Sequence, residues 1–591
     1  MKQKLQTALK AAVRAKENSI YLLIRKSLFL KSPVTPARSA ISFPFSTAAK
    51  QCQNAKSAKS TQLPSKITPP LAKHLTASIF VATTSLTLAL IYTHTHPLYA
   101  KTPPNNENEP NDPTSHPRRI RLHELSAHGP YSPRPWVLHH NRVYDITSFL
   151  PLHPGGDIIL RAAGGSIDPY WDIFSIHKTN GAAELLEEYY IGDVDERDLD
   201  AEGKVRVEWV DDPFKGDPDR DGGLVVLTSR PFNAESGEEG LREWRTGSGV
   251  FYVRNHMWVP EIKPEQHKLV VEMLDGEEKE YSLEDLKSKF KETTITATLQ
   301  CSGNRRKHMS ENARAATGLQ WGVGAISNAV WTGVRLRDVL ADAGLDVDEL
   351  PEDAKHAQFV GAEAFGSSIP IETAVDRRGD VLLAYGMNGE PLPPDHGAPL
   401  RVLVPGTVAA RSVKWLKKVV VSEDESPSQW QRRDYKCFGP NVKGNPEWDE
   451  APAIQEMPVQ SAITRLRELS REYDSDRSVL QGLETDKDWV IVEGYAWSGG
   501  GRKIIRVDVS ADDGKSWHQA DLLPDESLGS KSWSWKRWQW VIPRTQAGGC
   551  FVVKAADEAG NSQPKEYEPY WNFRGNLTNS WHRVDSSQSK A

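Results

Sequence analysis

A polar, acid-rich stretch from residue 198 to residue 222 divides this chain of 591 residues. The stretch ends in DPFKGDPDRDG, and a segment with so many charges, prolines and glycines cannot bury enough apolar surface to form a core. We expect it to be a flexible hinge. A Pro/Asn-rich stretch, residues 101–118, is expected to be a second linker. The chain is also too long for one hydrophobic core, so it must fold as several units.

Three folded units are expected around these two linkers. Residues 119–197 form a compact unit, and residues 223–450 form a large mixed α/β unit with short strands and Gly-rich loops. Residues 451–591 are expected to be all-β. The fold class is therefore a multidomain α+β protein.

The last unit has the pattern of an immunoglobulin-like β-sandwich. Ile505, Val507 and Val509 alternate with polar residues, which is the period of a strand. Asp513-Gly514 then supplies a hairpin turn. Short strands with such turn signals favour a two-sheet sandwich.

The first hundred residues differ in charge from the rest of the chain. They hold 14 Lys and Arg and a single acid, a net charge of +13, which leaves −19 on the remainder. Residues 1–73 are expected to be a mitochondrial transit segment, with a disordered tail that carries no targeting signal as the alternative. Residues 74–100 contain the apolar run TASIFVATTSLTLALIY, 17 residues long, which as a helix reaches about 26 Å against a bilayer core of about 30 Å. We expect a sorting segment for the mitochondrial intermembrane space, with a retained membrane anchor as the alternative.

Charge and cysteine content exclude several classes of protein. An acidic body lacks the basic patches that neutralise phosphates, so we expect no nucleic acid partner. The four cysteines have no short spacing, which argues against a disulfide framework or a Cys-rich zinc site. A single cysteine within a unit is then either core filler or a ligand.

Two histidines in the first unit are candidate haem ligands. His153 begins an HPGG motif, in which proline ends the local helix and the glycines let the backbone pass close to a flat ligand. His177 follows 24 residues later in a helical context. Two imidazoles on opposite sides of haem iron leave no open position, and such a site transfers electrons. The alternatives are a turn that contains a histidine and a surface histidine.

The motif and its surroundings resemble the b5-type cytochrome family over about residues 119–195, with Trp136, Tyr144 and Phe149 part of the likeness. This resemblance implies a b-type haem with His153 and His177 as axial ligands. Residues 184–202 contain nine acids and one arginine. Such a run is usually a solvated face, but beside a haem it could steer a cationic redox partner.

Three short blocks in the second unit carry the remaining chemistry. They are FYVRNH (251–256), LQCSGNRR (299–306) and DHGAPLR (395–401). A cysteine beside two arginines should have a depressed pKa, because positive charge favours the thiolate, which binds soft or high-valent metals. A buried structural cysteine is the alternative. Spaced cationic and imidazole donors in the third block, with Arg411 and Lys414 downstream, suit an anionic, phosphate-bearing cofactor.

With GAISNAVWTGVRLRDVL (324–340), LLAYGMNGEPLP (382–393) and WQRRDYK (430–436), these blocks resemble the eukaryotic sulfite oxidase family over essentially all of residues 119–591. The resemblance implies a molybdopterin-type molybdenum cofactor with Cys301 as the protein thiolate on molybdenum. Implied cofactor-binding residues are Arg254, Asn255, His256, Cys301, His396, Arg401 and Lys414. Implied catalytic residues around the substrate oxyanion are Cys301, Arg254, Arg306, Trp321, Tyr435 and Arg574.

The resemblance further implies the two-electron oxidation of sulfite to sulfate. Electrons would pass through the haem to cytochrome c, and the C-terminal sandwich would form a homodimer. Two positions depart from the family pattern, with Phe365 in place of a common Tyr and Glu363 in place of an expected Asp, so the cofactor contact there is in doubt.

Two rival functions are considered. One is a nitrate reductase-like molybdoenzyme, but in that family the haem unit follows the molybdenum unit, and here it comes first. The other is a haem-binding adaptor with an inactive molybdenum fold, which the intact Cys301, Arg306 and Tyr435 argue against.

Overall fold

The computed structural model describes residues 117–150, 153, 156–173, 182–206, 212–363, 365–444, 446–469 and 488–585. All of them belong to the compact unit Asp112–Ala591. The expected transit segment, the sorting segment, most of the first linker and the candidate ligand His177 lie outside the described residues. Within the described ranges no helix is both long and apolar enough to cross a bilayer.

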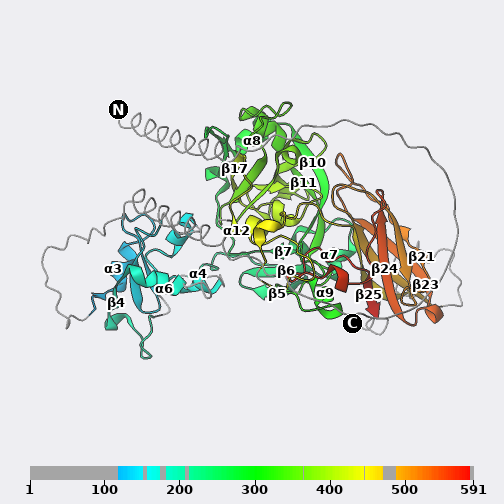
Figure 1. Cartoon of the computed structure of the whole chain (residues 1–591), viewed down its shortest axis with the longest axis horizontal. Coiled ribbons are helices and arrows are strands. Elements are labelled where there is room, and N and C mark those ends of the chain that lie inside the picture. Colours follow the sequence, from blue (N-terminus) through cyan, green and yellow to red (C-terminus); the bar gives the residue numbers. More distant parts are fainter. Residues whose placement is uncertain are drawn as a thin grey trace, which may run out of the picture. The chain divides into compact units, whose positions relative to one another are not determined.

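The first domain is built on a four-stranded sheet in the order β1-β4-β3-β2, seen in Figure 1 with short helices around it. Its strands are β1 (Arg119–Ile120), β2 (Trp136–His139), β3 (Arg142–Asp145) and β4 (Tyr190–Val194). Its helices are α3 (Leu122–Ala127), α4 (Asp168–Ile173), α6 (Ala182–Leu186) and the 3₁₀-helices η2 (Gly156–Ala162), η3 (Glu187–Tyr189) and η4 (Glu196–Asp198).

Both faces of this small sheet are buried. Trp136 and Leu138 of β2 pack into one apolar cluster with Ile120 and Leu125, whereas Val137 packs into the cluster on the opposite face. This division follows from the alternation of side chains along a strand. The Val137 face also collects Phe149, so it is the face toward the HPGG motif.

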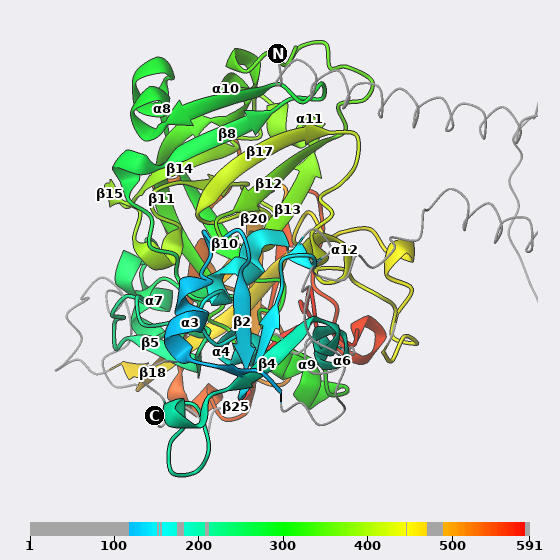
Figure 2. The ribbon, with the colours of Figure 1, turned by 90° about the vertical axis from the view of Figure 1, so that its left-hand side faces the viewer.

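Two five-stranded sheets and one small sheet make up the second domain. One sheet holds β10 (Glu292–Gln300), β11 (Ile326–Arg335), β14 (Leu382–Met387), β15 (Glu390–Pro391) and β16 (Arg401–Leu403). The other holds β13 (Gly366–Pro370), β12 (His356–Gly361), β17 (Leu416–Ser422), β8 (Lys268–Glu272) and β9 (Glu278–Ser282), and Figure 2 shows β8, β17, β12 and β13 side by side. The small sheet holds β5 (Leu224–Ser229), β6 (Phe232–Ser236) and β7 (Val253–Arg254).

Short helices connect these strands. They are α7 (Glu238–Arg242), α8 (Leu283–Lys289), α9 (Arg306–Asn312), α10 (Leu336–Asp342), α11 (Ile371–Val375), α12 (Gln429–Arg432) and the 3₁₀-helices η6 (Ser248–Val250), η7 (Pro264–Gln266), η8 (Pro394–His396), η9 (Ala409–Arg411) and η10 (Trp448–Glu450). Helix α8 begins with a capping box, in which the Ser282 side chain accepts from Asp285 N–H and the Asp285 carboxylate accepts from Ser282 N–H. Local sequence thus sets where that helix begins.

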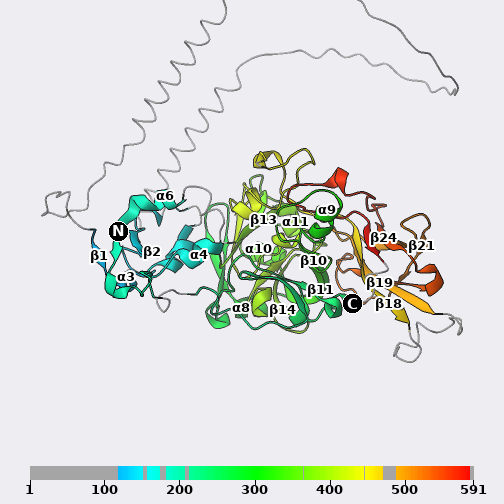
Figure 3. The same cartoon turned by 90° about the horizontal axis from the view of Figure 1, so that it is seen from below.

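The third domain is the expected two-sheet sandwich. One sheet has the order β18-β19-β23-β22 and the other β21-β20-β24-β25, and Figure 3 shows β18 and β19 beside β24. Their bounds are β18 (Gln460–Leu469), β19 (Trp489–Trp497), β20 (Ile504–Ser510), β21 (His518–Gln519), β22 (Asp521–Leu522), β23 (Lys536–Pro543), β24 (Cys550–Asp557) and β25 (His582–Asp585), with the 3₁₀-helices η11 (Arg544–Gln546) and η12 (Glu568–Tyr570). Asp513 and Gly514, the predicted turn between β20 and β21, have φ of 58° and 80°. Both residues therefore adopt the left-handed conformation, within a seven-residue loop that joins the two strands.

The polar stretch that the sequence marks as one long hinge is bound at both ends. Leu199 and Val205 form an isolated bridge, and Asn141 of the first domain donates to Gly203 O at 2.6 Å. At the other end Phe214 packs against the core of the second domain. Eight residues, 206–213, lie between Val205 and Phe214, and a chain of that length spans at most about 28 Å.

Candidate active site

A cavity of about 680 Å³, part of it open to solvent, lies in the second domain. All seven residues expected to bind the cofactor line it, together with Tyr435, which is expected at the substrate. These are Arg254, Asn255, His256, Cys301, His396, Arg401, Lys414 and Tyr435. Five separate stretches of the chain therefore converge on one space.

Cys301 lies directly after β10, where the chain leaves the sheet. Its N–H donates to Ala325 O at 3.0 Å, which ties the loop to the residue before β11. The next residue, Ser302, donates from its hydroxyl to Asn576 Oδ1 at 2.9 Å. The side chain of Cys301 is buried at the cavity wall. The loop thus presents the thiol to the cavity and takes part of its support from the C-terminal domain.

The Arg306 side chain is buried next to this loop. It donates from Nε to Arg574 O at 2.6 Å, from Nη1 to Leu319 O at 2.8 Å and from Nη2 to Asn576 Oδ1 at 3.2 Å. A guanidinium has five N–H groups, so two remain without an acceptor among the described residues. Burial lowers the pKa of Arg306, and the neighbouring Cys301 opposes this shift only in part.

Arg306, Trp321 and Arg574 do not line the cavity itself. Trp321 is buried in the same apolar cluster as Cys301. Arg574 pairs with Asp434 and lies close enough to His256 to contribute to the low pKa of that imidazole. The structure thus places these three residues around the Cys301 loop, beside the cavity wall.

The opposite wall of the cavity is cationic. Burial and the nearby positive charge of Lys414 lower the pKa of His396 to about 4. Burial lowers the pKa of Lys414 to about 7 and that of Arg401 to about 10. Arg401 donates to His396 O at 2.9 Å and to Ser412 O at 2.8 Å, both neutral acceptors. An anion in the cavity would offset this burial, because opposite charge stabilises the protonated forms.

His256 and Tyr435 form a buried pair, with Nε2 of the imidazole 2.9 Å from the tyrosine hydroxyl. Burial first, and then Arg254, Lys414 and Arg574, hold the pKa of His256 well below its ordinary value. Burial raises the pKa of Tyr435. Both side chains are therefore neutral near pH 7. When His256 carries its proton on Nε2, the tyrosine O–H is free to donate into the cavity.

The two residues that depart from the family pattern both line the cavity. Glu363 is buried, burial raises its pKa to about 8, and its Oε2 atom has no hydrogen-bond partner in the described part of the chain. Phe365 packs against His256 and Trp430, with ring centroids 4.9 and 5.0 Å apart. A buried carboxyl oxygen without a partner is costly, so Oε2 of Glu363 is a candidate hydrogen-bonding atom for a ligand.

In the first domain the described residues give one side of the candidate haem site. The ring of His153 lies 5.7 Å from that of Phe149, centroid to centroid, and Phe149 belongs to the apolar cluster of Val137, Tyr144 and Ile146. An apolar wall beside an imidazole suits the flat, apolar face of a haem.

Sequence reasoning missed two polar residues that organise the site. Asp395 lines the cavity and accepts from Asn255 Nδ2 at 2.8 Å, although it begins the DHGAPLR block and could have been chosen from that block. Asn576 bonds Arg306, Ser302 and the carbonyl of Lys436. No sequence signal pointed to Asn576, because its partners are up to 274 residues away.

The donors of the cavity fit the molybdenum cofactor expected from the sequence. The thiol of Cys301 suits a metal that binds sulfur. The buried cations, which bond neutral oxygens, and the unpaired oxygen of the Glu363 carboxyl suit a phosphate-bearing organic ligand. Asp395 and Glu363 also line the cavity, but they do not neutralise all of its cations. An anionic ligand is therefore electrostatically favoured.

Comparisons with known proteins agree with this arrangement. Residues 121–195 match the cytochrome b5-like haem/steroid binding domain, residues 256–430 the oxidoreductase molybdopterin binding domain, and residues 451–589 the Mo-co oxidoreductase dimerisation domain.

The sulfite oxidase of Gallus gallus is 44% identical over 484 residues, which cover 79% of this chain and 100% of that protein. The mitochondrial sulfite oxidase of Homo sapiens is 44% identical over 475 residues, which cover 78% of this chain and 83% of that protein. A nitrate reductase of Hordeum vulgare is 38% identical, but the match covers only 41% of its length. The chain belongs to the sulfite oxidase family.

Proposed function

We propose that this protein is a mitochondrial enzyme that oxidises sulfite to sulfate at a molybdenum centre and passes the electrons through its b5-type haem to cytochrome c. The observation that carries this proposal is the convergence of Cys301 and the cationic residues of three other chain segments on one cavity. The similarity to sulfite oxidases along all three domains supports the same function.

Cys301 is the proposed protein ligand of molybdenum. The bound cofactor supplies the two-electron oxidation, which no amino acid side chain can perform alone. The protein holds its anionic part with Arg401, Lys414 and His396, and Asn255 adds an amide to the same wall. Each of these groups is fixed by hydrogen bonds of its own, so the cavity is organised before the ligand binds.

The substrate oxyanion is proposed to bind where the cavity meets the Cys301 loop. Arg306 has two N–H groups left for sulfite, and Arg254 lines the cavity beside it. Guanidinium groups recognise such oxyanions through paired hydrogen bonds. Tyr435 remains protonated and would donate a hydrogen bond to a water or to an oxygen of the substrate. Trp321 closes the apolar side of the loop.

Cytochrome c is the proposed acceptor, and the intermembrane space is the proposed location. The first domain, residues 119–197, has a net charge of −4, which favours a cationic partner. The basic leader and the apolar run, both outside the described residues, support delivery to that compartment. A homodimer through the third domain agrees with the dimerisation-domain match of residues 451–589.

The test is elemental analysis for molybdenum and iron together with a sulfite-dependent cytochrome c reduction assay on the purified chain. Molybdenum and iron in near-equal amounts and sulfite-dependent reduction are expected. Iron without molybdenum would instead favour the haem-binding adaptor.

Replacing Cys301 by Ser should abolish sulfite turnover and leave the b-type haem spectrum unchanged, because the thiol lies in a different domain from the haem ligand. Absorption spectra and steady-state assays of the variant check this. Appreciable turnover would remove Cys301 from the metal. The exposed Cys437, replaced by Ser in the same way, is the matched control and should retain activity.

A further inference from the structure

The segment 212–222 forms a strap over the second domain. Phe214 packs against the core of that domain, and Asp217 accepts the N–H of Val259 at 2.9 Å. Near its end Arg220 turns inward, and its side chain is only 15% exposed. The strap therefore ends in a nearly buried charge, which a solvated linker would not contain.

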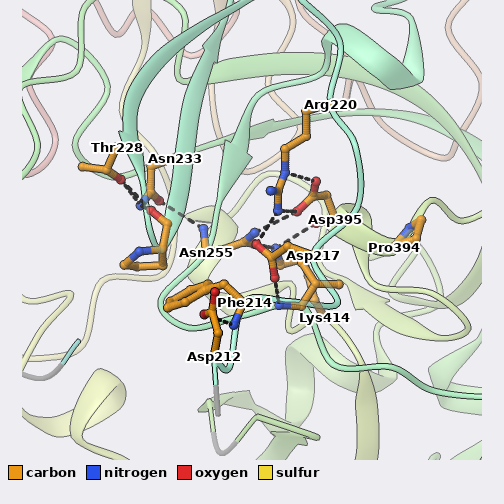
Figure 4. A network of polar contacts seen from close by, with 12 residues as sticks. Asp212, Phe214, Asp217, Arg220, Thr228, Asn233, Asn255, Pro394, Asp395 and Lys414 are labelled. Carbon is orange, nitrogen blue, oxygen red and sulfur yellow. Dashed lines mark hydrogen bonds and ion pairs between the residues drawn. The ribbon is translucent and has the colours of Figure 1, made fainter. Parts of the chain in front are cut away.

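Arg220 forms a two-pronged ion pair with Asp395. Its Nε donates to Asp395 Oδ2 at 2.9 Å and its Nη2 to Asp395 Oδ1 at 3.1 Å, while Nη2 also bonds Asp217 at 2.8 Å. The guanidinium lies over the ring of Phe232, 4.1 Å from its centroid. Figure 4 shows the guanidinium facing the Asp395 carboxylate.

Asp395 connects the strap to the cavity. Its carboxylate also accepts from Asn255 Nδ2 at 2.8 Å, and its backbone carbonyl accepts from Lys414 Nζ at 2.8 Å. Lys414 donates further to Asn255 Oδ1 (Figure 4). Asp395, Asn255 and Lys414 all line the cavity. Arg220 of the strap is thus connected to the wall of the cavity through one intermediate residue, Asp395.

The arrangement keeps the Asp395 carboxylate apart from the Lys414 ammonium group, and the two charges would otherwise neutralise each other. Within the described ranges Lys414 makes no ion pair: its ammonium group donates to the neutral oxygens of Asp395 and Asn255 and lies over the ring of Trp415. The Asp395 carboxylate is directed to Arg220 instead. Without Arg220 the buried Asp395 carboxylate would be unpaired, which is strongly disfavoured. Lys414 would then be the nearest cation with which it could pair.

We propose that Arg220 is a positioning residue for the cofactor: it holds the Asp395 carboxylate away from Lys414, which keeps the Lys414 ammonium free for the anionic part of the ligand. The strap 212–222 is then part of the cofactor site and not part of the linker. This inference rests on the proposed molybdenum cofactor, and the measurements below separate the two.

The first experiment compares the full-length chain with its Arg220→Gln variant. The molybdenum-to-iron ratio is measured after purification, and molybdenum release is followed during incubation at moderate temperature. Loss of one charge-assisted contact should speed release by about tenfold or more. Arg230→Gln is the matched control, since Arg230 pairs with Asp212 of the same strap but is 62% exposed, and it should behave as the wild type.

The results distinguish the two levels of the proposal. A wild-type chain without molybdenum would overturn the proposed function. A wild-type chain that holds molybdenum, together with an Arg220→Gln variant that holds it equally long, would overturn only the role of Arg220.

A second measurement tests whether Arg220 acts on the ligand or merely on the fold. Cofactor-free forms of both proteins, from a host that cannot make the cofactor, are compared by thermal unfolding: the variant should still unfold well above the incubation temperature, and a variant that is already unfolded at that temperature would overturn the proposal. In an Asp395→Asn background, Arg220→Gln should add little to the release rate, because its effect passes through that carboxylate. Additive effects of the two changes would also overturn the proposal.

Discussion

At the scale of single residues, the site is marked by buried guanidinium groups that bond neutral oxygens. Arg305 donates to Tyr567 Oη and Ser580 O, both at 2.7 Å, and Arg411 donates to Ile454 O at 2.8 Å. Neither forms an ion pair within the part of the chain that the structure describes. Buried charges without acids cost stability. Arg401, which lines the cavity and bonds only neutral oxygens, is the member of this group whose position favours a ligand that supplies negative charge.

Arg306 and Gly318, which lies against the Arg306 guanidinium, give two linked predictions. Arg306→Gln should raise the KM for sulfite and lower kcat, because a charge-assisted contact in a closed site contributes about 1.5–3 kcal/mol. Gly318→Ala should have a milder effect of the same kind. Gly318 has φ of +115°, and an added Cβ would lie 2.9 Å from Arg306 Nη1, so the guanidinium must shift. Steady-state kinetics at several sulfite concentrations check both, and unchanged kinetics in both variants would show that Arg306 does not contact sulfite.

His308 gives a prediction for pH. Burial first, and then Arg305 and Lys307, lower the pKa of His308 to about 3. The unfolded chain therefore binds a proton between about pH 6.5 and 3 that the folded chain does not. Stability is complete above pH 6.5 and falls as the pH drops, by up to about 1.4 kcal/mol per pH unit for this group.

His308→Leu should accordingly make the loss of stability between pH 7.5 and 5 smaller than in the wild type. Nδ1 of His308 has no hydrogen-bond partner among the described residues, so the substitution breaks no such contact there. Urea unfolding at the two pH values checks this. The exposed His518, replaced in the same way, serves as control. An acid dependence equal to that of the wild type would contradict the assignment to His308.

At the scale of elements, the polar stretch 198–222 shows where composition misleads. Its charges predict solvent exposure, yet Arg220 and Asp217 are directed into the second domain and meet partners there. Arg220 and Asp395 are 175 residues apart, so no local pattern could reveal the pair. The strand Ile504–Ser510 of the sandwich was predictable because hydrophobic period and turn residues are local signals. Cys301 and Lys414 were found because their motifs are short and their chemistry is specific.

Residues 206–211 give the prediction at this scale. If the first domain must move to exchange electrons, its range depends on this short segment. Deletion of three of these residues should slow electron transfer from molybdenum to haem several-fold and leave the KM for sulfite unchanged. Flash photolysis of the variant measures the transfer rate. A Gly/Ser replacement of the original length is the control, and a rate that does not depend on length would show that the haem domain works from one position.

At the scale of the whole molecule, charge bears on how the first domain would meet the proposed acceptor. The acidic run of residues 184–202 is partly neutralised within its own domain, since Arg142 pairs with Glu187 at 2.6 Å and Arg121 with Asp198 at 2.7 Å. Glu184 and Glu188 are exposed and make no ion pair within the described ranges. Steering of a cationic partner therefore depends on a few acids and not on the whole run.

We accordingly expect kcat/KM for cytochrome c to fall as ionic strength rises from about 10 to 150 mM, because the screening length shortens from about 30 to 8 Å. Replacing Glu184 and Glu188 by Gln should flatten this dependence. Replacing the paired Asp195 by Asn is the comparison, because its charge is already compensated by Arg197. Salt titrations of the reduction rate measure the slopes. Equal slopes in all three proteins would mean that cytochrome c approaches another surface.

The support that Asn576, Tyr567 and Ser580 give to the Cys301 loop has a consequence for biosynthesis. All three lie at least 266 residues after Cys301 and are therefore translated after it. The ribosome delivers the proposed metal-binding cysteine before the groups that hold its loop, so we expect cofactor loading to wait until residues 567–580 have been made. A premature stop codon near residue 565 would spare every proposed cofactor contact in the second domain. It would nevertheless leave Arg305, Arg306 and Ser302 without their C-terminal partners, and the product would be a haem protein that cannot keep its molybdenum.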